Sequence, residues 1–201
     1  MKFVAIDTSQ EYLTVIAVNG DKKSFIYLND CGFQHSVTLL NNLEKCLTEV
    51  GLRSDEVELF GVTVGPGSFT GIRIGVASAK GFCAVGGTKA VAVTSFETMA
   101  YSAKEGKYLT VIDAHHGNYY VCGFEDREIV IQPKFMTFDE LTSIEGFKLI
   151  SGKEIPVLKT EVVDTSKGLY NAVIAKYNQT IDADLIVPFY LRLSQAEEGR
   201  P

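Results

Sequence analysis

The chain contains an internal duplication, and this repeat limits the folds that it can adopt. Residues 4–7 read Val-Ala-Ile-Asp and residues 110–113 read Thr-Val-Ile-Asp, and a turn followed by an aromatic and β-branched segment comes after each of them. The two aspartates, Asp7 and Asp113, lie 106 positions apart. Repeats that stack into solenoids are much shorter, roughly 20–50 residues. The sequence therefore predicts two related lobes.

The predicted elements follow the same order in both lobes, β-β-β-α-β-α-β. The first lobe covers residues 1–103 and the second residues 104–201, whose last residues are expected to pack back on the first lobe. In the first lobe the apolar patterns predict strands at 3–7, 12–18, 24–28, 59–64 and 89–93 and helices at 35–50 and 71–85. In the second they predict strands at 110–113, near 119, at 129–131, 147–150 and 185–187, and helices after Thr137 and at 169–177. The chain is thus expected to be an α/β protein with a mixed five-stranded sheet in each lobe.

This order, with an aspartate at the end of the first strand of each lobe, resembles the actin-like ATPase (ASKHA) and sugar kinase fold. The resemblance implies that two turns face each other and hold the phosphates and metal of a nucleotide. The turn residues here are Asp7, Thr8, Ser9 and Asp113. The first turn has no glycine to bring backbone amides close to a phosphate, and the second lobe has no double-glycine segment for adenosine. We therefore expect no self-sufficient nucleotide clamp, and both aspartates can instead accept hydrogen bonds within their turns.

Composition and charge exclude several classes of protein. The 201 residues are 46% hydrophobic and 22% charged, as in ordinary soluble proteins. The net charge of −6 argues against a large nucleic-acid surface, so we expect contacts with RNA to be shared with a partner. The four cysteines form no Cys-x-x-Cys pair, and no apolar run is long enough for a signal peptide or a membrane span. We expect a cytoplasmic protein with no metal site of its own.

The segment 65–75, Gly-Pro-Gly-Ser-Phe-Thr-Gly-Ile-Arg-Ile-Gly, carries the strongest local signal. It lies between a predicted strand and a predicted helix, where a tight turn needs glycine and a serine or threonine caps the helix. Free amides at a helix start also hold anions. The candidate anion loop comprises Gly65, Gly67, Ser68, Thr70, Gly71 and Arg73. The glycine spacing differs from that of dinucleotide-binding and Walker motifs, and a capped turn without a ligand is the alternative.

The helix predicted at 71–85 is apolar on all sides, so it must be covered on more than one side. Gly71, Gly75 and Ala79 recur every four positions and would allow another helix to approach closely. Either the helix at 35–50 supplies all of the cover, or the two helices together present an apolar surface to another protein. In the second case the expected interface residues are His35, Leu39, Leu40, Leu43, Leu47, Ile72, Gly75, Val76 and Ala79.

Several motifs are similar to those of the TsaB family, also called YeaZ or glycoprotease-like proteins. The resemblance rests on residues 65–75 with 77–82, and on residues 5–9, 35–36, 113–114 and 188–192. It implies a non-catalytic subunit that pairs with the actin-like subunit TsaD and the small ATPase TsaE, docking through its first two long helices. That complex transfers threonylcarbamoyl to N6 of the adenosine beside the anticodon in tRNAs that read codons beginning with A. ATP, metal and threonylcarbamoyl-adenylate would then belong to the partner subunits or to the shared interface, and tRNA would be contacted through the complex.

One turn departs from the family pattern, because His115 and His116 stand where two arginines are usual. Histidine makes the charge of that turn depend on pH. An ATP-dependent kinase or ATPase of the actin-like fold stays an alternative. A glycoprotease-type metallopeptidase is another, although zinc needs at least three converging ligands. An unmet apolar surface would also allow the free protein to form a homodimer through the same helices.

Overall fold

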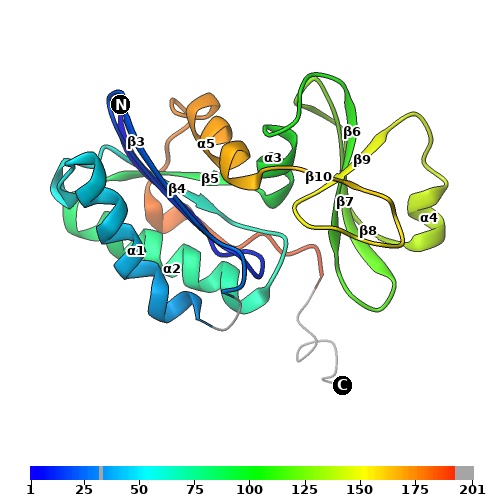
Figure 1. Ribbon diagram of the computed structural model, residues 1–201, viewed down its shortest axis with the longest axis horizontal. Helices are drawn as coiled ribbons and strands as arrows, with labels where there is room; N and C mark the ends of the chain where they lie inside the picture. Colours follow the sequence, from blue (N-terminus) through cyan, green and yellow to red (C-terminus); the bar gives the residue numbers. More distant parts are fainter. Residues whose placement is uncertain (32–33, 193–201) are drawn as a thin grey trace.

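The computed structural model describes residues 1–31 and 34–192, and these residues form two lobes with one five-stranded sheet each (Figure 1). The N-terminal lobe contains β1 (Lys2–Asp7), β2 (Leu13–Asn19), β3 (Lys22–Leu28), α1 (His35–Val50), η1 (Ser54–Glu56), β4 (Leu59–Thr63), α2 (Phe69–Gly86), β5 (Lys89–Val93) and α3 (Ser95–Ala100). The C-terminal lobe contains β6 (Lys107–Asp113), β7 (Asn118–Glu125), β8 (Glu128–Thr137), α4 (Phe138–Thr142), β9 (Lys148–Ser151) and β10 (Glu161–Val162). Helix α5 (Thr165–Ala175) and the 3-10 turn η2 (Ala183–Leu185) follow. Among the described residues, no helix is both long and apolar enough to cross a membrane.

The two sheets repeat one topology. Their strand orders are β3-β2-β1-β4-β5 and β10-β9-β6-β7-β8, so the first strand of each lobe lies at the centre of its sheet. In both sheets this central strand pairs antiparallel with the strand that follows it and parallel with a later strand, β4 or β9. The predicted α/β fold with two duplicated lobes is confirmed.

Helix starts follow the local signals of the sequence. The side chain of Ser68 caps α2 by accepting a hydrogen bond from the N–H of Gly71 (3.2 Å). Thr94 and Glu97 form a capping box at α3, and the same box recurs at Thr137 before α4. A cap satisfies N–H groups that the helix leaves unpaired and contributes about 0.5–2 kcal/mol.

Helix α5 covers the N-terminal sheet, although the sequence order assigned it to the second lobe. Leu169, Ala172 and Val173 are fully buried, in one apolar cluster with Phe3 of β1 and Val91 of β5. Figure 1 shows α5 on the opposite side of that sheet from α1 and α2. Burying a side chain such as Leu169 contributes about 1.5–3 kcal/mol. The apolar spacing predicts a helix here, but it contains no information about which sheet the helix covers.

The segment after α5, residues 181–192, also runs along the N-terminal lobe. The strand predicted at 185–187 is wrong, because η2 and an irregular stretch stand there, and the fifth strand of the C-terminal sheet is β10 instead. Ile181 forms an antiparallel bridge with Ala90 of β5, and Ile186 is 1% exposed. The N–H of Phe189 donates to the carbonyl oxygen of Val64 (2.8 Å). The segment therefore packs along the lobe through residues such as Ile186 without forming a sheet, while Leu185 and Val187 stay exposed.

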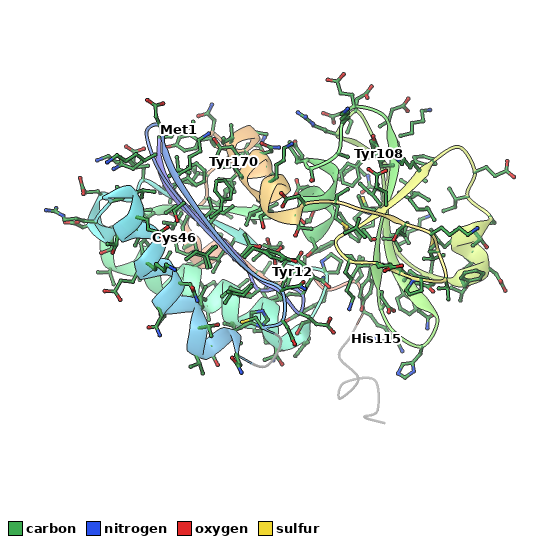
Figure 2. All side chains as sticks on the ribbon, viewed as in Figure 1. Met1, Tyr12, Cys46, Tyr108, His115 and Tyr170 are labelled. Atoms are coloured by element: carbon green, nitrogen blue, oxygen red, sulfur yellow. The ribbon has the colours of Figure 1, made fainter. Side chains whose placement is uncertain are left out.

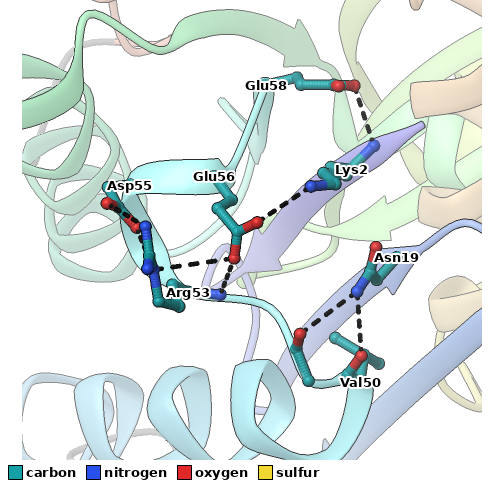
Figure 3. A network of polar contacts seen from close by, with 8 residues as sticks. Lys2, Asn19, Val50, Arg53, Asp55, Glu56 and Glu58 are labelled. Carbon is teal, nitrogen blue, oxygen red and sulfur yellow. Dashed lines mark hydrogen bonds and ion pairs between the residues drawn. The ribbon is translucent and has the colours of Figure 1, made fainter.

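A polar network covers the end of the N-terminal sheet where β1 begins (Figure 3). The backbone N–H of Lys2 donates to Glu58 (3.0 Å) and its ammonium group to Glu56 (3.1 Å), while Arg53 pairs with Asp55 (2.8 Å). Ion pairs at the surface contribute about 0–1 kcal/mol each. These contacts fix a connection between strands, and the turn that holds Asp7 lies at the other end of β1.

Candidate functional site

The turn after β1 buries its aspartate. Asp7 is 1% exposed, and its Oδ1 accepts a hydrogen bond from the N–H of Ser9 (2.8 Å). The hydroxyl of Tyr12 donates to Oδ2 (3.3 Å). Burial raises the pKa of Asp7, and the hydrogen bonds from Ser9 oppose that rise. The carboxyl group therefore organises the turn, and it faces neither solvent nor a phosphate site.

The turn after β6 repeats this hydrogen bond in a different setting. Oδ1 of Asp113 accepts from the N–H of His115 (2.7 Å), and Asp113 is partly exposed. His115 and His116 are exposed and have φ values of 65° and 55°, a left-handed conformation that costs a non-glycine residue roughly 1–2 kcal/mol. Figure 2 shows His115 at the tip of the β6–β7 hairpin. The two imidazoles thus belong to an open surface turn.

The cavity beside Asp113 is too small for a nucleotide. It is lined by Gln10 and Tyr12 from one lobe and Lys153 from the other, and its volume is about 20 Å³. This volume holds about one water molecule, whereas ligand sites occupy roughly 300–1,000 Å³. Nζ of Lys153 also pairs with Oε2 of Glu11 across the lobes (2.9 Å) and lowers the pKa of Glu11. Among the described residues, this cavity beside Asp113 therefore leaves no room for ATP.

The glycine segment, residues 65–75, packs closely against the backbone of the turn after β1. A Cβ on Gly67 would lie 2.1 Å from the carbonyl oxygen of Ser9, and one on Gly71 would lie 2.0 Å from that of Thr8. The N–H of Ser68 donates to the Ser9 carbonyl (2.7 Å), and the Thr8 hydroxyl donates to the Gly71 carbonyl (2.7 Å). Carbonyl oxygens thus occupy the space that an anion would need, and they repel negative charge. These glycines bring the turn against α2, and an anion-binding role of the loop stays a prediction.

The other residues of the candidate anion loop face the C-terminal segment or solvent. A Cβ on Gly65 would lie 2.8 Å from the carbonyl oxygen of Phe189. Thr70 is exposed. Nε of Arg73 donates to the hydroxyl of Tyr190 (3.0 Å), and its guanidinium group lies 3.7 Å from the ring centroid of Phe69. Arg73 is therefore engaged within the chain.

Most of the predicted interface residues lie in the core. The buried ones are His35, Leu39, Leu43, Leu47, Ile72, Gly75, Val76 and Ala79. Nε2 of His35 is hydrogen-bonded to the carbonyl oxygen of Tyr12 (2.9 Å), and a Cβ on Gly75 would lie 2.6 Å from the Thr8 hydroxyl. The strip of small residues therefore brings α2 onto its own turn and sheet. These eight residues are buried in the described chain, and Leu40 alone of the predicted set is exposed (64%). Their contact with a partner stays a prediction.

Helices α1 and α2 nevertheless carry exposed apolar residues, of which Leu40 alone belongs to the predicted interface set. This outer patch consists of Val37 (72% exposed) and Leu40 of α1, and of Ala77, Gly81, Ala84 and Val85 (93% exposed) of α2. A Cβ on Gly81 would meet no atom within 4 Å. A glycine in the middle of a helix costs about 0.5–1 kcal/mol relative to alanine, and no described residue of the chain uses the space it leaves. In the sequence, the one sign of this exposed face is Gly81, a glycine inside a predicted helix that the packing of the described chain does not require.

Burial makes the thiols of Cys83 and Cys122 poor nucleophiles. Cys31, Cys46, Cys83 and Cys122 are all buried and unbridged. Burial raises the pKa of Cys83 to about 11 and is the main cause that raises the pKa of Cys122 to about 12, whereas nucleophilic attack needs the thiolate. Across residues 1–31 and 34–192, no group of three His, Cys, Asp or Glu side chains is placed to hold a metal ion. The outer patch is thus one functional candidate among these residues.

Comparisons with known proteins agree on one family. The family model described as TsaD, tRNA N6-adenosine threonylcarbamoyltransferase, matches residues 29–166. The tRNA threonylcarbamoyladenosine biosynthesis protein TsaB of Bacillus subtilis (strain 168) is 25% identical over 98% of this chain and 96% of its own length. The chain belongs to the TsaB/YeaZ family. TsaB of Escherichia coli (strain K12) is 29% identical over 68% of this chain and 64% of its own length.

Solved structures show the same TsaB/YeaZ fold over nearly the whole chain. YeaZ from Pseudomonas aeruginosa superposes with a TM-score of 0.79 at 20% identity, covering 94% of this chain and 99% of that structure. A second structure from that organism, described as an uncharacterized protein with similarity to peptidase YEAZ, gives a TM-score of 0.80 at 20% identity and covers 95% and 99%. The family resemblance inferred from the sequence motifs is confirmed.

Proposed function

We propose that the chain is a non-catalytic subunit of the machinery that forms threonylcarbamoyladenosine in tRNA. Its relatives in Bacillus subtilis and Escherichia coli are named for this biosynthesis. Three features support a role without chemistry: the buried Asp7 carboxyl group, the 20 Å³ cavity between the turns, and the protonated thiols. In this proposal the complex transfers threonylcarbamoyl to N6 of the adenosine beside the anticodon, and a TsaD-type subunit carries out the transfer.

The docking surface for that subunit is the outer patch on α1 and α2. The observation that carries this part is the open space over Gly81, on a stripe of small exposed residues that allows another helix to approach closely. A stable interface buries about 800 Å² on each partner, so neighbouring polar residues would form its rim. A TsaE-like ATPase then joins the assembled pair. In the absence of a partner, two copies of the chain can cover the same patch.

Substitution of Ala77 by arginine tests the docking surface. Ala77→Arg places a charge and a long side chain on the stripe, and we expect co-purification with the TsaD-type subunit of the same cell to fall at least 10-fold. Ala175→Arg is the matched control, because Ala175 is also an exposed helical alanine but lies at the end of α5. Unchanged association of Ala77→Arg, judged by sedimentation with purified partner, would show that docking occurs elsewhere.

A reconstituted reaction tests the absence of catalysis. The purified chain is expected to give no modified tRNA from threonylcarbamoyl-adenylate, and the partner is expected to restore the reaction. Calorimetric titration with Mg-ATP addresses the kinase alternative, which micromolar binding with turnover would establish. Proteolysis that a chelator abolishes would favour the metallopeptidase instead.

A further inference from the structure

A second hollow lies between β3 and the start of α5, away from the outer patch. Its volume is about 750 Å³, within the range of roughly 300–1,000 Å³ that is typical of ligand sites. We call it the aromatic groove, and its main side chains are Phe25, Tyr27, Val162, Thr165, Lys167 and Tyr170. Gly152 at its floor also borders the small cavity beside Asp113, but neither aspartate turn lines the groove. The groove is therefore separate from the place where actin-like proteins would hold a nucleotide.

Two aromatic rings of the groove are unusually exposed. Phe25 and Tyr27 are 45% and 44% exposed, because α5 packs on β1, β2 and β5 and leaves this side of the edge strand β3 open. Each ring is supported by another. The ring centroid of Phe25 lies 5.6 Å from that of Tyr170, and that of Tyr27 lies 5.4 Å from that of Tyr12. Figure 2 shows Tyr170 on α5 and Tyr12 near the turn end of the strands. The two rings thus form a rigid apolar platform.

Positive charge flanks this platform, although the chain as a whole carries a net charge of −6. Nζ of Lys23 lies 4.7 Å from the ring centroid of Tyr170, and Lys167 stands in the first turn of α5. With the described part of the chain, neither ammonium group forms an ion pair. The carboxylate of Asp164 is used to cap α5, accepting from the N–H groups of Ser166 (3.0 Å) and Lys167 (3.1 Å). Lys167 in the groove and Lys23 beside it, over the Tyr170 ring, therefore place positive charge near the two exposed rings.

We propose that the aromatic groove binds unpaired nucleotides of an RNA. Bases stack on Phe25 and Tyr27, and Lys23 and Lys167 contact phosphates. Side chains at alternate positions of a strand are on one face and about 6.6 Å apart, so each ring accepts its own base. Stacking accepts any base because every base has a π-face, and RNA is recognised chiefly where its bases are unpaired. The choice of RNA as the ligand rests on the proposed role in tRNA modification. The description of the two aromatic rings rests on the structure alone.

The edge of β3 argues against an added protein strand as the occupant. The strand begins with Lys22 and Lys23, and lysine on an edge strand is a common means of preventing strand addition. The same residues suit a phosphate backbone. A peptide ligand is thus an outcome that the experiment must exclude.

Fluorescence anisotropy of the full chain with a labelled, unstructured RNA dodecamer tests the proposal. Phe25→Ala and Tyr27→Ala are each expected to weaken binding roughly 5- to 150-fold, the range for loss of one stacked base. Tyr27→Phe keeps the ring and should bind like the parent chain. Phe138→Ala is the matched control, because Phe138 is an exposed phenylalanine (40%) in the other lobe. Replacing Lys23 and Lys167 together by alanine should reduce the slope of log K against log salt by about 1.4.

Three results would overturn the proposal. The first is unchanged RNA binding by both Phe25→Ala and Tyr27→Ala. The second is equal affinity for AMP and for the dodecamer, which would indicate a site for a mononucleotide. The third is tighter binding of a peptide than of RNA. If an alanine variant unfolds, ultraviolet cross-linking of the parent chain replaces it, and adducts on Phe25 or Tyr27 are expected while adducts confined to other residues refute the site. The docking proposal fails separately, because Ala77→Arg should still bind RNA and Tyr27→Ala should still bind the partner.

Discussion

The two aspartate turns share one local geometry and differ in what covers them. Asp7 and Asp113 each end the central strand of a sheet, and each accepts a hydrogen bond from the N–H two residues later. Asp7 is almost completely buried, because the glycine segment and α2 lie against its turn. The turn of Asp113 has no such cover and exposes His115 and His116. The comparison shows that a distant segment, rather than the turn itself, decides whether the carboxyl group meets solvent.

Removing the close approach at Gly71 should disturb this difference most. Gly71→Ala places a Cβ 2.0 Å from the Thr8 carbonyl oxygen, so either the turn or α2 must move. We expect a loss of about 3 kcal/mol or more in the free energy of unfolding, measured by urea denaturation. Gly81→Ala in the same helix is the control and should stabilise the protein by about 0.5–1 kcal/mol, since its Cβ meets no atom. A mild effect at Gly71 would show that its turn is not tightly held.

The buried carboxyl group should also give the first turn a distinct response to pH. Because burial raises the pKa of Asp7, the folded state holds this proton more tightly than the unfolded chain does. Its contribution to stability is therefore complete below the unfolded pKa of about 3.8 and is lost as the pH rises through the folded value. Relative to Asp7→Asn, the free energy of unfolding of the parent chain should therefore fall as the pH rises above the unfolded pKa of Asp7.

Asp113→Asn is the matched change in the second turn. At pH 7 it should alter the free energy of unfolding by less than about 0.5 kcal/mol, as surface substitutions usually do. Parallel pH profiles for the parent chain and Asp7→Asn would contradict the prediction for the first turn. Thermal unfolding over a series of buffers measures both.

The smallest effect on the free energy of unfolding is expected at the ion pair between Glu11 and Lys153, which joins the two lobes. Glu11 and Lys153 are 66% and 50% exposed in their side chains, so their coupling in a double-mutant cycle should be at most about 0.5 kcal/mol and should shrink in high salt. Since Lys153 lowers the pKa of Glu11, this stability is present above the unfolded pKa and is lost as the pH falls through the folded value. A coupling that persists in molar salt would show that the pair is less solvated than its exposure indicates.

Much of the fold could be predicted from the sequence, because it rests on local signals. The repeat of an aspartate after an apolar strand predicts the lobes, and Ser68 and Thr137 mark helix starts that the structure confirms. The candidate site was less accessible to prediction. An apolar pattern on all sides of a helix does not show which face is inside, so the strip with Gly75 and Ala79 was assigned outward although it packs inward.

Contacts between distant residues account for the remaining differences. The carbonyl oxygen of Thr8 lies directly against Gly71. This contact joins two segments that are far apart in the sequence, so neither motif alone predicts it. The helix at α5 was expected from its own apolar spacing, but its place on the N-terminal sheet depends on matching apolar surfaces. The aromatic groove needs β3 and α5 together, so neither segment alone indicated it.

The return of α5 and residues 181–192 to the N-terminal lobe has a consequence for synthesis of the protein. The first hundred residues leave the ribosome with the face of their sheet around Phe3 and Val91 uncovered, because the helix that buries it is translated later. Exposed apolar strands of incomplete domains are prone to aggregate. The apolar face of the N-terminal sheet is therefore completed only after α5 has been translated.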